Sequence, residues 1–380
     1  MQEVVVHKKT YKYRLFPTKS QRTKLNNMLE ICRQVYNQTL GTRKDAWEQE
    51  KKSLSRNDLN KLITKWKVEK PEWKQVHSQV LQNVSERVDL AYKAFFRRVK
   101  AGQEPGYPRF KGYGRYDSFT FPQSGFSLNG DTLKISKIGK VRINLHRPIG
   151  CDISTLTIQR DRLGNWYACF VCDVETVPLP QSDKVVGIDL GLTTFAQLSD
   201  GNKIKRERWL KRDIKDLKRI QRKVSALPKG SLERAKAIRS LNHVHHRIKN
   251  RRDNFAHQQS RKLVDTYQVI VFEDLQIKNM QSNGNKVINY NIADVAWNSF
   301  VEKTIYKAVE AGRLVIKVNP KNTSQECSGC HEIVKKDLTV RKHNCPHCGL
   351  SIDRDLNASI NILGRGLASL GYKAIEAPLL

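Results

Sequence analysis

Two cysteine pairs in the C-terminal part of the chain have the spacing of a metal site. Cys327 and Cys330 are separated by two residues, as are Cys345 and Cys348, and fourteen residues lie between the pairs. Two such pairs at this distance predict a zinc ribbon, in which four thiolates hold one tetrahedral Zn²⁺. A closed four-cysteine site is structural rather than catalytic, so we expect one zinc ion that stabilises a small fold.

A third pair, Cys169 and Cys172, has the same C-x2-C spacing but a different context. It lies in W-Y-A-C-F-V-C-D-V, whose alternation is typical of a strand. A separation of three residues points the two thiols to opposite faces of a strand, so we interpret them as packing residues. Because half of the eight cysteines fall in one metal-like pattern, the set favours a reducing cytoplasm over a disulfide framework.

Three acidic residues stand at the ends of apolar segments and could perform hydrolytic chemistry. Asp189 follows V-V-G-I, Glu273 follows V-I-V-F, and Asp355 precedes L-N-A-S-I-N-I-L. Carboxylates brought together repel one another unless a cation lies between them. Two Mg²⁺ ions about 3.5–4 Å apart would remove that repulsion, and such a pair hydrolyses phosphodiesters.

Each acid taken alone has an ordinary alternative. Asp189 could be a turn residue, Glu273 a surface residue at a strand end, and Asp355 the N-cap of the helix that follows it. The order along the chain favours a shared site instead. Along the chain there follow, in this order, a strand with an acid, basic helices, a second strand with an acid, the ribbon, and an acid before a helix.

The segments around these residues indicate which elements position them. Residues 185–191 and 269–275 are nearly continuous apolar runs, as expected for strands buried on both faces. Upstream, residues 10–17 alternate like a half-buried strand, and residues 20–99 have the helical period. Strands return over 118–178, where Asn129-Gly130 and Gly164-Asn165 occupy hairpin-turn positions. We expect the first strand to join this later antiparallel sheet or barrel, which makes the helices an insertion.

The charge of the chain predicts a polyanionic partner. Its 380 residues include 69 Lys and Arg against 37 Asp and Glu, a net charge of +32 that a compact protein tolerates when a polyanion neutralises it. Residues 203–262 hold half of this surplus, with 21 Lys or Arg against five Asp or Glu. This imbalance is too one-signed for a solvated face with internal ion pairs, so we predict a surface that faces phosphates.

No apolar run approaches the length of a membrane span, and the first residues have no signal-peptide core. We therefore expect a cytoplasmic protein.

Taken together, these motifs resemble a known family. The combination of G-I-D-L-G, F-E-D-L and C-x2-C…C-P-H-C-G…D-R-D-L-N-A-S-I-N-I is similar to the transposon-encoded TnpB proteins, the presumed ancestors of the type V CRISPR effectors. The resemblance extends over nearly the whole chain, through Y-K-Y-R-L-F-P-T, L-A-Y-K-A-F-F-R-R, G-Y-P-R-F-K and W-N-S-F-V-E-K-T-I-Y-K-A. The short acidic strings are weak motifs alone, whereas their joint order with the ribbon is specific.

The resemblance implies an RNA-guided, Mg²⁺-dependent DNA endonuclease with an RNase H-like, RuvC-type nuclease domain. By motif position, Asp189, Glu273 and Asp355 match the catalytic, magnesium-binding acids of the family. Asp353 is the alternative within D-R-D, and Asp274 should point to the face opposite Glu273. The implied partners are a structured guide RNA and target double-stranded DNA with a short adjacent motif. A monomer in a prokaryotic cytoplasm, associated with the nucleoid when bound to DNA, is the implied setting.

The resemblance also implies a multidomain α+β architecture. It places a wedge-like β-barrel in residues 1–18 and 104–180, a helical recognition insert in 19–103, the nuclease domain in 181–322 and 350–380, and the zinc ribbon in 323–349. Base pairing with the guide would supply most of the sequence specificity.

Two alternatives remain on the same scaffold. One is a catalytically inactive RNA-guided DNA-binding repressor, but the presence of all three acids favours a nuclease. The other is a DNA transposase that also uses three acids, and the position of the ribbon before the third acid argues against it.

Overall fold

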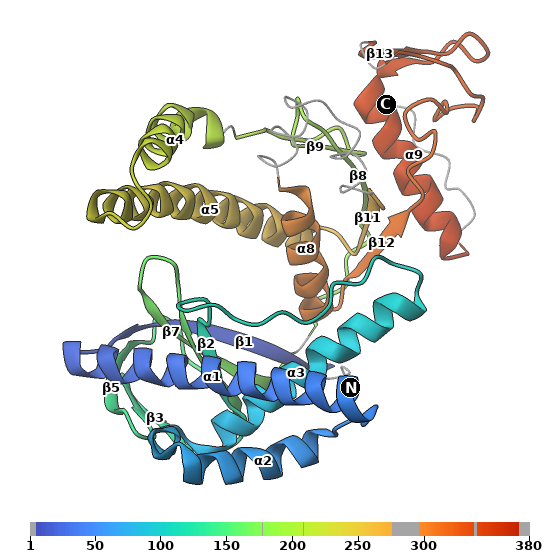
Figure 1. Ribbon diagram of the computed structural model, residues 1–380. Coiled ribbons are helices and arrows are strands. Elements are labelled where there is room, and N and C mark those ends of the chain that lie inside the picture. Colours follow the sequence, from blue (N-terminus) through green and yellow to red (C-terminus); the bar gives the residue numbers. More distant parts are fainter. Residues whose placement is uncertain (1–4, 177, 208, 276–295, 338–339, 372–380) are drawn as a thin grey trace. The chain divides into compact units, whose positions relative to one another are not determined.

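The structure is a computed structural model that describes residues 5–176, 178–207, 209–275, 296–337 and 340–371 (Figure 1). The chain divides into two compact units, one formed by Val6–Val174 and the other by Met1–Val5 with Glu175–Leu380. Across the described ranges, no helix is long and apolar enough to cross a membrane.

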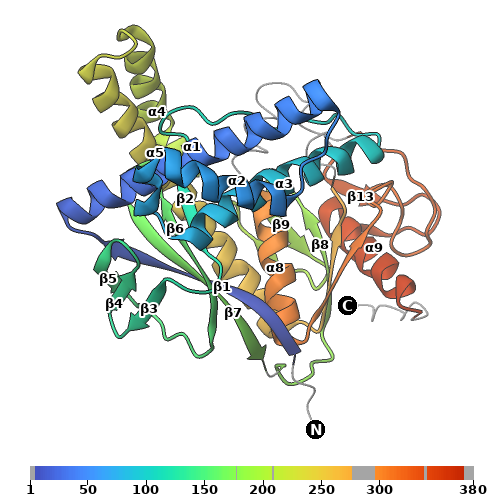
Figure 2. The same ribbon diagram turned by 60° about the horizontal axis from the view of Figure 1, so that its bottom comes forward.

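The first unit is built on a seven-stranded sheet that forms a nearly closed barrel. Its strand order is β2-β6-β7-β1-β5-β4-β3, so the first strand of the chain lies between two later ones, as predicted. Figure 2 shows β3, β4 and β5 as a meander at one end of this sheet. The strands are β1 (Val5–Phe16), β2 (Ser118–Phe121), β3 (Phe126–Asn129), β4 (Thr132–Ile135), β5 (Gly139–Asn144), β6 (Ile153–Arg160) and β7 (Trp166–Thr176).

Side-chain alternation in this sheet follows the predicted pattern. In β7 the core side chains include Phe170 and Cys172, whereas Cys169 lies on the other face and is only partly buried. The two thiols therefore point to opposite faces, which confirms that they are packing residues. Gly130 and Gly164 adopt positive φ values of 53° and 80° in the two predicted hairpin turns, a conformation that glycine reaches without strain.

Helices fill the interval between β1 and β2, which confirms the predicted insertion. They are α1 (Lys19–Glu50), α2 (Arg56–Glu69), a 3-10 turn (Pro71–Gln75) and α3 (Ser78–Lys100). The Thr18 hydroxyl and the Gln21 side chain form a capping box that starts α1. Val84 and Val88 of α3 share one core with the barrel, whereas Val99 near the end of the helix is 50% exposed.

The second unit contains a five-stranded mixed sheet in the order β10-β9-β8-β11-β12. Strands β8, β11 and β12 are parallel, whereas β9 and β10 are antiparallel to their neighbours. This arrangement is the RNase H-like fold, and it confirms the two strands predicted over 185–191 and 269–275. The strands are β8 (Val185–Leu190), β9 (Ala196–Leu198), β10 (Lys203–Ile204), β11 (Val269–Glu273) and β12 (Leu314–Val318).

Helices cover both faces of this sheet. On one face, Phe272 of β11 packs with Phe300 of α8 (Trp297–Ala311) and with the end of α5 (Leu232–Thr266). On the other face, α9 (Arg354–Ser369) lies across β8 and β11 (Figure 1). The basic segment folds as α4 (Trp209–Ala226) packed against α5.

Helix α9 approaches the sheet closely because glycines leave room for it. A Cβ atom on Gly187 of β8 would lie 2.2 Å from the carbonyl oxygen of Ser359, and one on Gly366 of α9 would lie 2.5 Å from the Val271 side chain. Both contacts are shorter than real Cβ atoms show, so the backbones of the helix and the strand meet directly. This contact fixes the start of α9 at the end of the parallel strands.

Candidate active site and metal centre

Two of the predicted acids, Asp189 and Glu273, lie near the C-terminal ends of β8 and β11, on one face of the second sheet. The third, Asp355, lies on the helix that packs against this face. Strands β8 and β11 pair in parallel, with Phe272 beside Ile188, so the next residues, Glu273 and Asp189, follow side by side. Phe272 and Ile188 belong to the core on the α8 face, and alternation therefore turns both acids toward α9. Asp355 lies in the first turn of α9.

The acids act on one another electrostatically. Burial, followed by the carboxylates of Glu273 and Asp355, raises the pKa of Asp189 to about 8, and Arg354 opposes this rise. Burial also raises the pKa of Glu273, which the hydrogen bond from the Thr323 hydroxyl partly offsets. Glu273 is buried and Asp189 and Asp355 are half-buried, and carboxyls in such a setting favour either protons or a cation. Carboxylates are donors that divalent hard cations prefer.

The cysteines and the acids differ in how closely their ligand atoms are gathered. Within the described part of the chain, the four ribbon cysteines form a group of potential metal ligands whose ligand atoms all lie within 4.8 Å of one another. An ion with ligands at about 2.1 Å brings its ligand oxygens within about 4.2 Å of one another. As they stand, the three acids do not form such a group, so a shared cation would draw their side chains closer.

The structure shows that Asp353 and Asp355 make different contacts. The Asp353 carboxylate accepts hydrogen bonds from the backbone N–H groups of Asp355, at 2.9 Å, and Leu356, at 3.3 Å, and it therefore caps α9. The cap role that the sequence allowed for Asp355 belongs to Asp353, so that alternative is wrong. Asp355 instead lies 3.1 Å from the guanidinium of Arg354. Asp274 is exposed, unlike the buried Glu273, so these neighbours point to opposite faces as predicted.

The four ribbon cysteines form a compact cluster. The sulfur atoms of Cys327 and Cys348 are 3.6 Å apart, as are those of Cys330 and Cys345. Four sulfurs around a tetrahedral zinc with Zn–S bonds of about 2.3 Å would be about 3.8 Å apart, so the cluster fits Zn²⁺ closely. Strands β13 (Lys342–Asn344) and β14 (Ser351–Asp353) pair beside it.

The backbone of the second cysteine turn prepares a thiolate. Although burial would raise it, the pKa of Cys345 is lowered to about 6 by the backbone N–H groups of Cys348 and His347 and by hydrogen bonds from neighbouring thiols, whereas the pKa values of Cys327 and Cys330 are raised. Thiolates are the form that binds zinc. The nearby histidines have other contacts, since His331 lies 3.0 Å from the Glu326 carboxylate and His343 contacts the Lys336 ammonium group.

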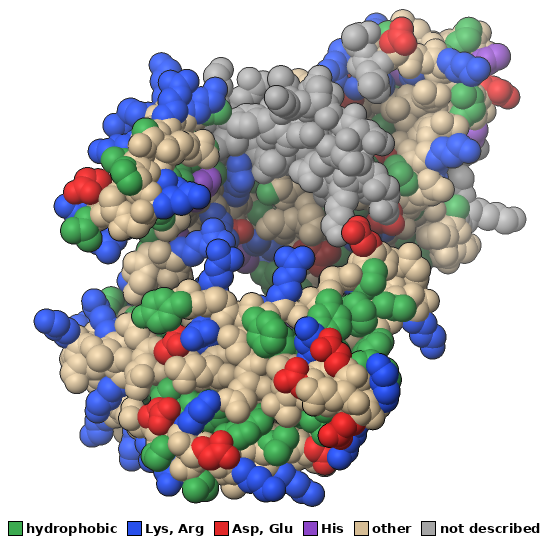
Figure 3. Space-filling model, viewed as in Figure 1, with side chains coloured by type: hydrophobic (Ala, Val, Ile, Leu, Met, Phe, Trp, Pro, Cys, Tyr) green, Lys and Arg blue, Asp and Glu red, His purple; other side chains and the backbone are tan. Residues whose placement is uncertain are grey.

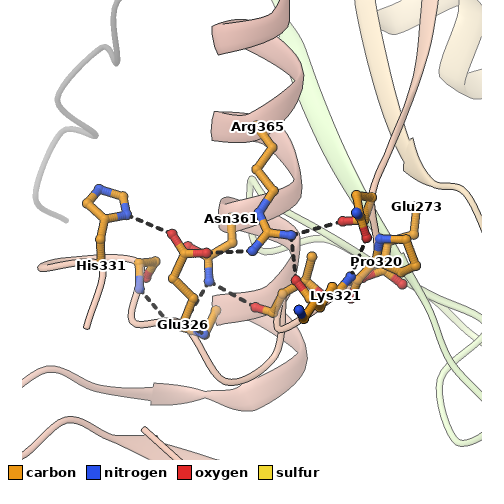
Figure 4. Close-up of polar contacts among 11 residues, drawn as sticks. Glu273, Pro320, Lys321, Glu326, His331, Asn361 and Arg365 are labelled. Atoms are coloured by element: carbon orange, nitrogen blue, oxygen red, sulfur yellow. Dashed lines mark hydrogen bonds and ion pairs between the residues drawn. The ribbon is translucent and has the colours of Figure 1, made fainter. Parts of the chain in front are cut away.

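Sequence reasoning missed a set of buried polar residues next to the acids. Thr323, Asn357 and Asn361 are at most 5% exposed, and they link α9 to the loop between β12 and the first cysteine turn (Figure 4). The signal was present in L-N-A-S-I-N-I-L, where polar residues recur four apart on a helix that must bury one face.

The second unit combines an RNase H-like sheet, acids at the ends of adjacent parallel strands, a third acid at the start of the packed helix and a cysteine ribbon just before that helix. These features define the RuvC-like nuclease architecture. Comparisons with known proteins agree with this class. Residues 297–362 match the family described as a Cas12f1-like TNB domain, 169–284 a probable transposase, and 7–52 a helix-turn-helix domain. The last segment folds here as strand β1 and the single helix α1.

Two relatives align along almost their full length. A putative RNA-guided DNA endonuclease of Streptomyces pristinaespiralis is 34% identical over 97% of this chain and 91% of its own. The putative RNA-guided DNA endonuclease InsQ of Escherichia coli is 29% identical over 95% of this chain and 92% of its own. The chain belongs to the TnpB family.

A solved structure shows the same fold. The protein in the cryo-EM structure of a Cas12f1–sgRNA–target DNA complex superposes with a TM-score of 0.61 over 94% of this chain and 98% of its own, at 11% sequence identity.

Proposed function

We propose that this protein is an RNA-guided, Mg²⁺-dependent DNA endonuclease, associated with a transposable element, that opens and cleaves double-stranded DNA. The observation that carries the proposal is the convergence of Asp189, Glu273 and Asp355, whose mutual field and burial raise the pKa of Asp189 to about 8. Two relatives that align over more than nine-tenths of the chain are named putative RNA-guided DNA endonucleases, which supports guide use.

In this proposal Asp189, Glu273 and Asp355 would hold two Mg²⁺ ions, because Mg²⁺ accepts carboxylates, waters and substrate phosphates together. When bound, such a pair activates water and stabilises the oxygen that leaves the phosphodiester. Burial and then both other carboxyls raise the pKa of Asp189, so a cation bound beside it would favour its charged form. The Asp353 carboxylate holds the first turn of α9 and so orients Asp355.

The basic pair of helices α4 and α5 is the proposed contact surface for nucleic-acid phosphates. Lys and Arg side chains gather over this pair (Figure 3). Asp213 is buried and already binds Arg247 and Arg251 at 2.5 and 2.8 Å, so few acids remain to neutralise the surface. Exposed cations on these helices include Lys215, Lys218, Arg222, Lys223, Lys236, Arg239 and Lys249. Their charge would bind guide RNA or target DNA independently of sequence.

The remaining parts take the roles that the family suggests. We assign residues 1–18 and 104–180 to a wedge-like barrel, 19–103 to a recognition insert, 181–322 and 350–380 to the nuclease domain, and 323–349 to the zinc ribbon. The wedge and the insert would hold the guide RNA and read a short motif beside the target. One chain carries all three acids and four cysteines, so a monomer is sufficient for the chemistry.

The test begins with the RNA that copurifies when the protein is expressed together with its native flanking DNA. We expect one defined RNA that ends in variable or flank-derived sequence, and this RNA defines the target for a Mg²⁺-dependent cleavage assay. Asp189→Ala should reduce cleavage by roughly three orders of magnitude while guide and target binding persist. Asp353→Asn, which keeps the helix cap, is the matched control and should still cut.

Cutting by Asp189→Ala at the wild-type rate would show that the active site lies elsewhere. A wild-type protein that binds guide and target but never cuts would instead favour the catalytically inactive repressor. A random mixture of cellular RNAs would argue against guide use and leave a basic nuclease without a guide.

A further inference from the structure

A continuous set of hydrogen bonds connects the first cysteine turn to the candidate catalytic glutamate. The set involves the loop of residues 319–326, which follows β12, and one side of α9 (Figure 4). It lies within the second unit, next to both candidate metal sites.

At one end, the Thr323 hydroxyl donates a hydrogen bond to the Glu273 carboxylate. Both residues are buried, with exposed fractions of 4% and 9%. A carboxylate that binds a metal has two oxygens, and a buried donor on one of them fixes the rotation of the group. Thr323 therefore restricts which Glu273 oxygen faces the neighbouring acids.

Asn361 of α9 holds Thr323 in place. Its side-chain amide donates to the carbonyl oxygens of Thr323, at 2.9 Å, and Glu326, at 2.7 Å. Both N–H groups are therefore engaged with the same loop. Because Asn361 is itself buried on the helix that carries Asp355, it ties the loop to the element that supplies the third acid.

The other end of the set reaches the cysteine turn. One helical turn earlier in α9, Asn357 donates to the Glu326 carbonyl at 2.7 Å and accepts from the Ser328 backbone N–H at 2.9 Å. Arg365 holds the same loop, because it lies 2.6 Å from the Glu326 carboxylate and donates to the Lys321 carbonyl at 2.7 Å. Ser328 lies between Cys327 and Cys330, so Asn357 connects the loop to the first cysteine turn.

From these contacts we infer that Thr323 is a positioning residue for Glu273, and that Asn361 is the bracket that keeps Thr323 in position. Asn357 belongs to the same network but secures the cysteine turn rather than the glutamate. This inference rests on the proposed function, in which Glu273 binds Mg²⁺. Loss of a residue that orients a metal ligand typically costs about 10- to 100-fold in metal affinity.

Thr323→Val tests the first part, because it keeps the shape of the side chain and removes the hydroxyl. We expect the Mg²⁺ concentration for half-maximal cleavage to rise about tenfold or more. Binding of Mn²⁺ to the RNA-free full-length chain, followed by electron paramagnetic resonance, should weaken by a similar factor. Thr323→Ser restores the hydroxyl and should return both values to near wild type.

Thr304→Val is the matched control for this substitution. Thr304 is also fully buried in the second unit, but its hydroxyl donates to the backbone carbonyl of Phe300 at 3.0 Å. It should lower the melting temperature as Thr323→Val does while leaving Mn²⁺ affinity unchanged. Equal Mn²⁺ affinities in the two valine variants would reduce Thr323 to a structural residue and overturn the inference.

The two asparagines provide a second test. Asn361→Ala should weaken Mn²⁺ binding, whereas Asn357→Ala should accelerate zinc release to a chelator and leave Mn²⁺ affinity near wild type. The same Mn²⁺ affinity in both variants would overturn the role of Asn361. Asp189→Ala in the same series separates the two proposals. If it still cuts, both are wrong, but if it is inactive while Thr323→Val behaves as wild type, only this inference fails.

Discussion

The two candidate metal sites of the second unit are built in opposite ways. The four cysteines fall within 22 consecutive residues, and two short turns bring their sulfurs together. The three acids come from elements far apart in sequence, and the register of β8 with β11 and the close packing of α9 bring them together. A site of the first kind can be recognised from spacing alone, whereas a site of the second kind exists only once the sheet has formed.

The two sites also reverse the usual order of acidity. An aspartate ordinarily ionises well below a cysteine. Here burial and neighbouring carboxylates raise the pKa of Asp189 to about 8, while backbone N–H groups lower the pKa of Cys345 to about 6. One thiol of the cysteine cluster is thus ionised at neutral pH, although the pKa values of Cys327 and Cys330 are raised, whereas Asp189 holds a proton until a cation displaces it.

The largest effect we expect follows from removing a zinc ligand. Cys345→Ser should reduce bound zinc from one ion per chain to a small fraction, because structural zinc contributes on the order of 10 kcal/mol to the folding of such small modules. The ribbon should unfold locally and cleavage should fall with it. Zinc content by atomic spectroscopy and the rate of proteolysis within 323–349 measure the change.

Cys169→Ser is the matched control, since Cys169 also lies in a C-x2-C pair but packs in strand β7. It should leave zinc content unchanged. Zinc lost equally from both variants would mean that the ribbon cluster is not the metal site.

The site of the three acids should be disrupted by a change in packing rather than by loss of a ligand. Gly187→Ala places a Cβ atom 2.2 Å from the Ser359 carbonyl oxygen and 2.6 Å from the Leu363 backbone nitrogen, so α9 must move away from β8. Such overpacking costs about 3 kcal/mol. We expect urea denaturation to show this loss, and cleavage to fall because the displaced helix carries Asp355.

A control on the same helix has the opposite sign. Gly364 is exposed in α9, and a Cβ atom there would meet nothing within 4 Å. Gly364→Ala should therefore stabilise the protein by about 0.5–1 kcal/mol, since alanine favours a helix over glycine. A destabilisation of equal size in both variants would show that the contact at Gly187 is not what holds the helix.

The sequence predicted those parts of the fold that have a strong local pattern. The continuous apolar runs that became β8 and β11 and the turn glycines were identified correctly for this reason. Strands β9 and β10, at three and two residues, are too short to carry a period. The helical period over 20–99 does not reveal where the core stops, and Val99 at the end of α3 is exposed.

The candidate site was predictable in its residues but not in its supports. Strand-end acids stand out in apolar runs, so Asp189 and Glu273 were identified, and their roles remain predictions. The resemblance favoured Asp355 over Asp353 as the third acid, but only the structure shows that Asp353 is the residue that caps α9. The contact of Thr323 with Glu273 joins residues 50 apart and has no sequence signature.

The pH dependence of metal binding sharpens the comparison of the two sites. Because the pKa of Asp189 is raised to about 8, a cation that binds beside Asp189 at lower pH must displace a proton. Apparent Mg²⁺ affinity should therefore rise with pH from 6 to 8, by up to about tenfold per unit for one displaced proton, and level off above 8. Half-saturating Mg²⁺ for cleavage, measured at several pH values, tests this.

Stability without metal should change in the opposite direction. An unfolded aspartate ionises near pH 3.9, so between about pH 4 and 8 the folded chain binds more protons at Asp189 than the unfolded chain does. The free energy of unfolding of the metal-free protein should therefore fall as pH rises through this window, and Asp189→Asn should flatten the dependence. A Mg²⁺ requirement that stays constant from pH 6 to 8 would mean that Asp189 keeps no proton to displace.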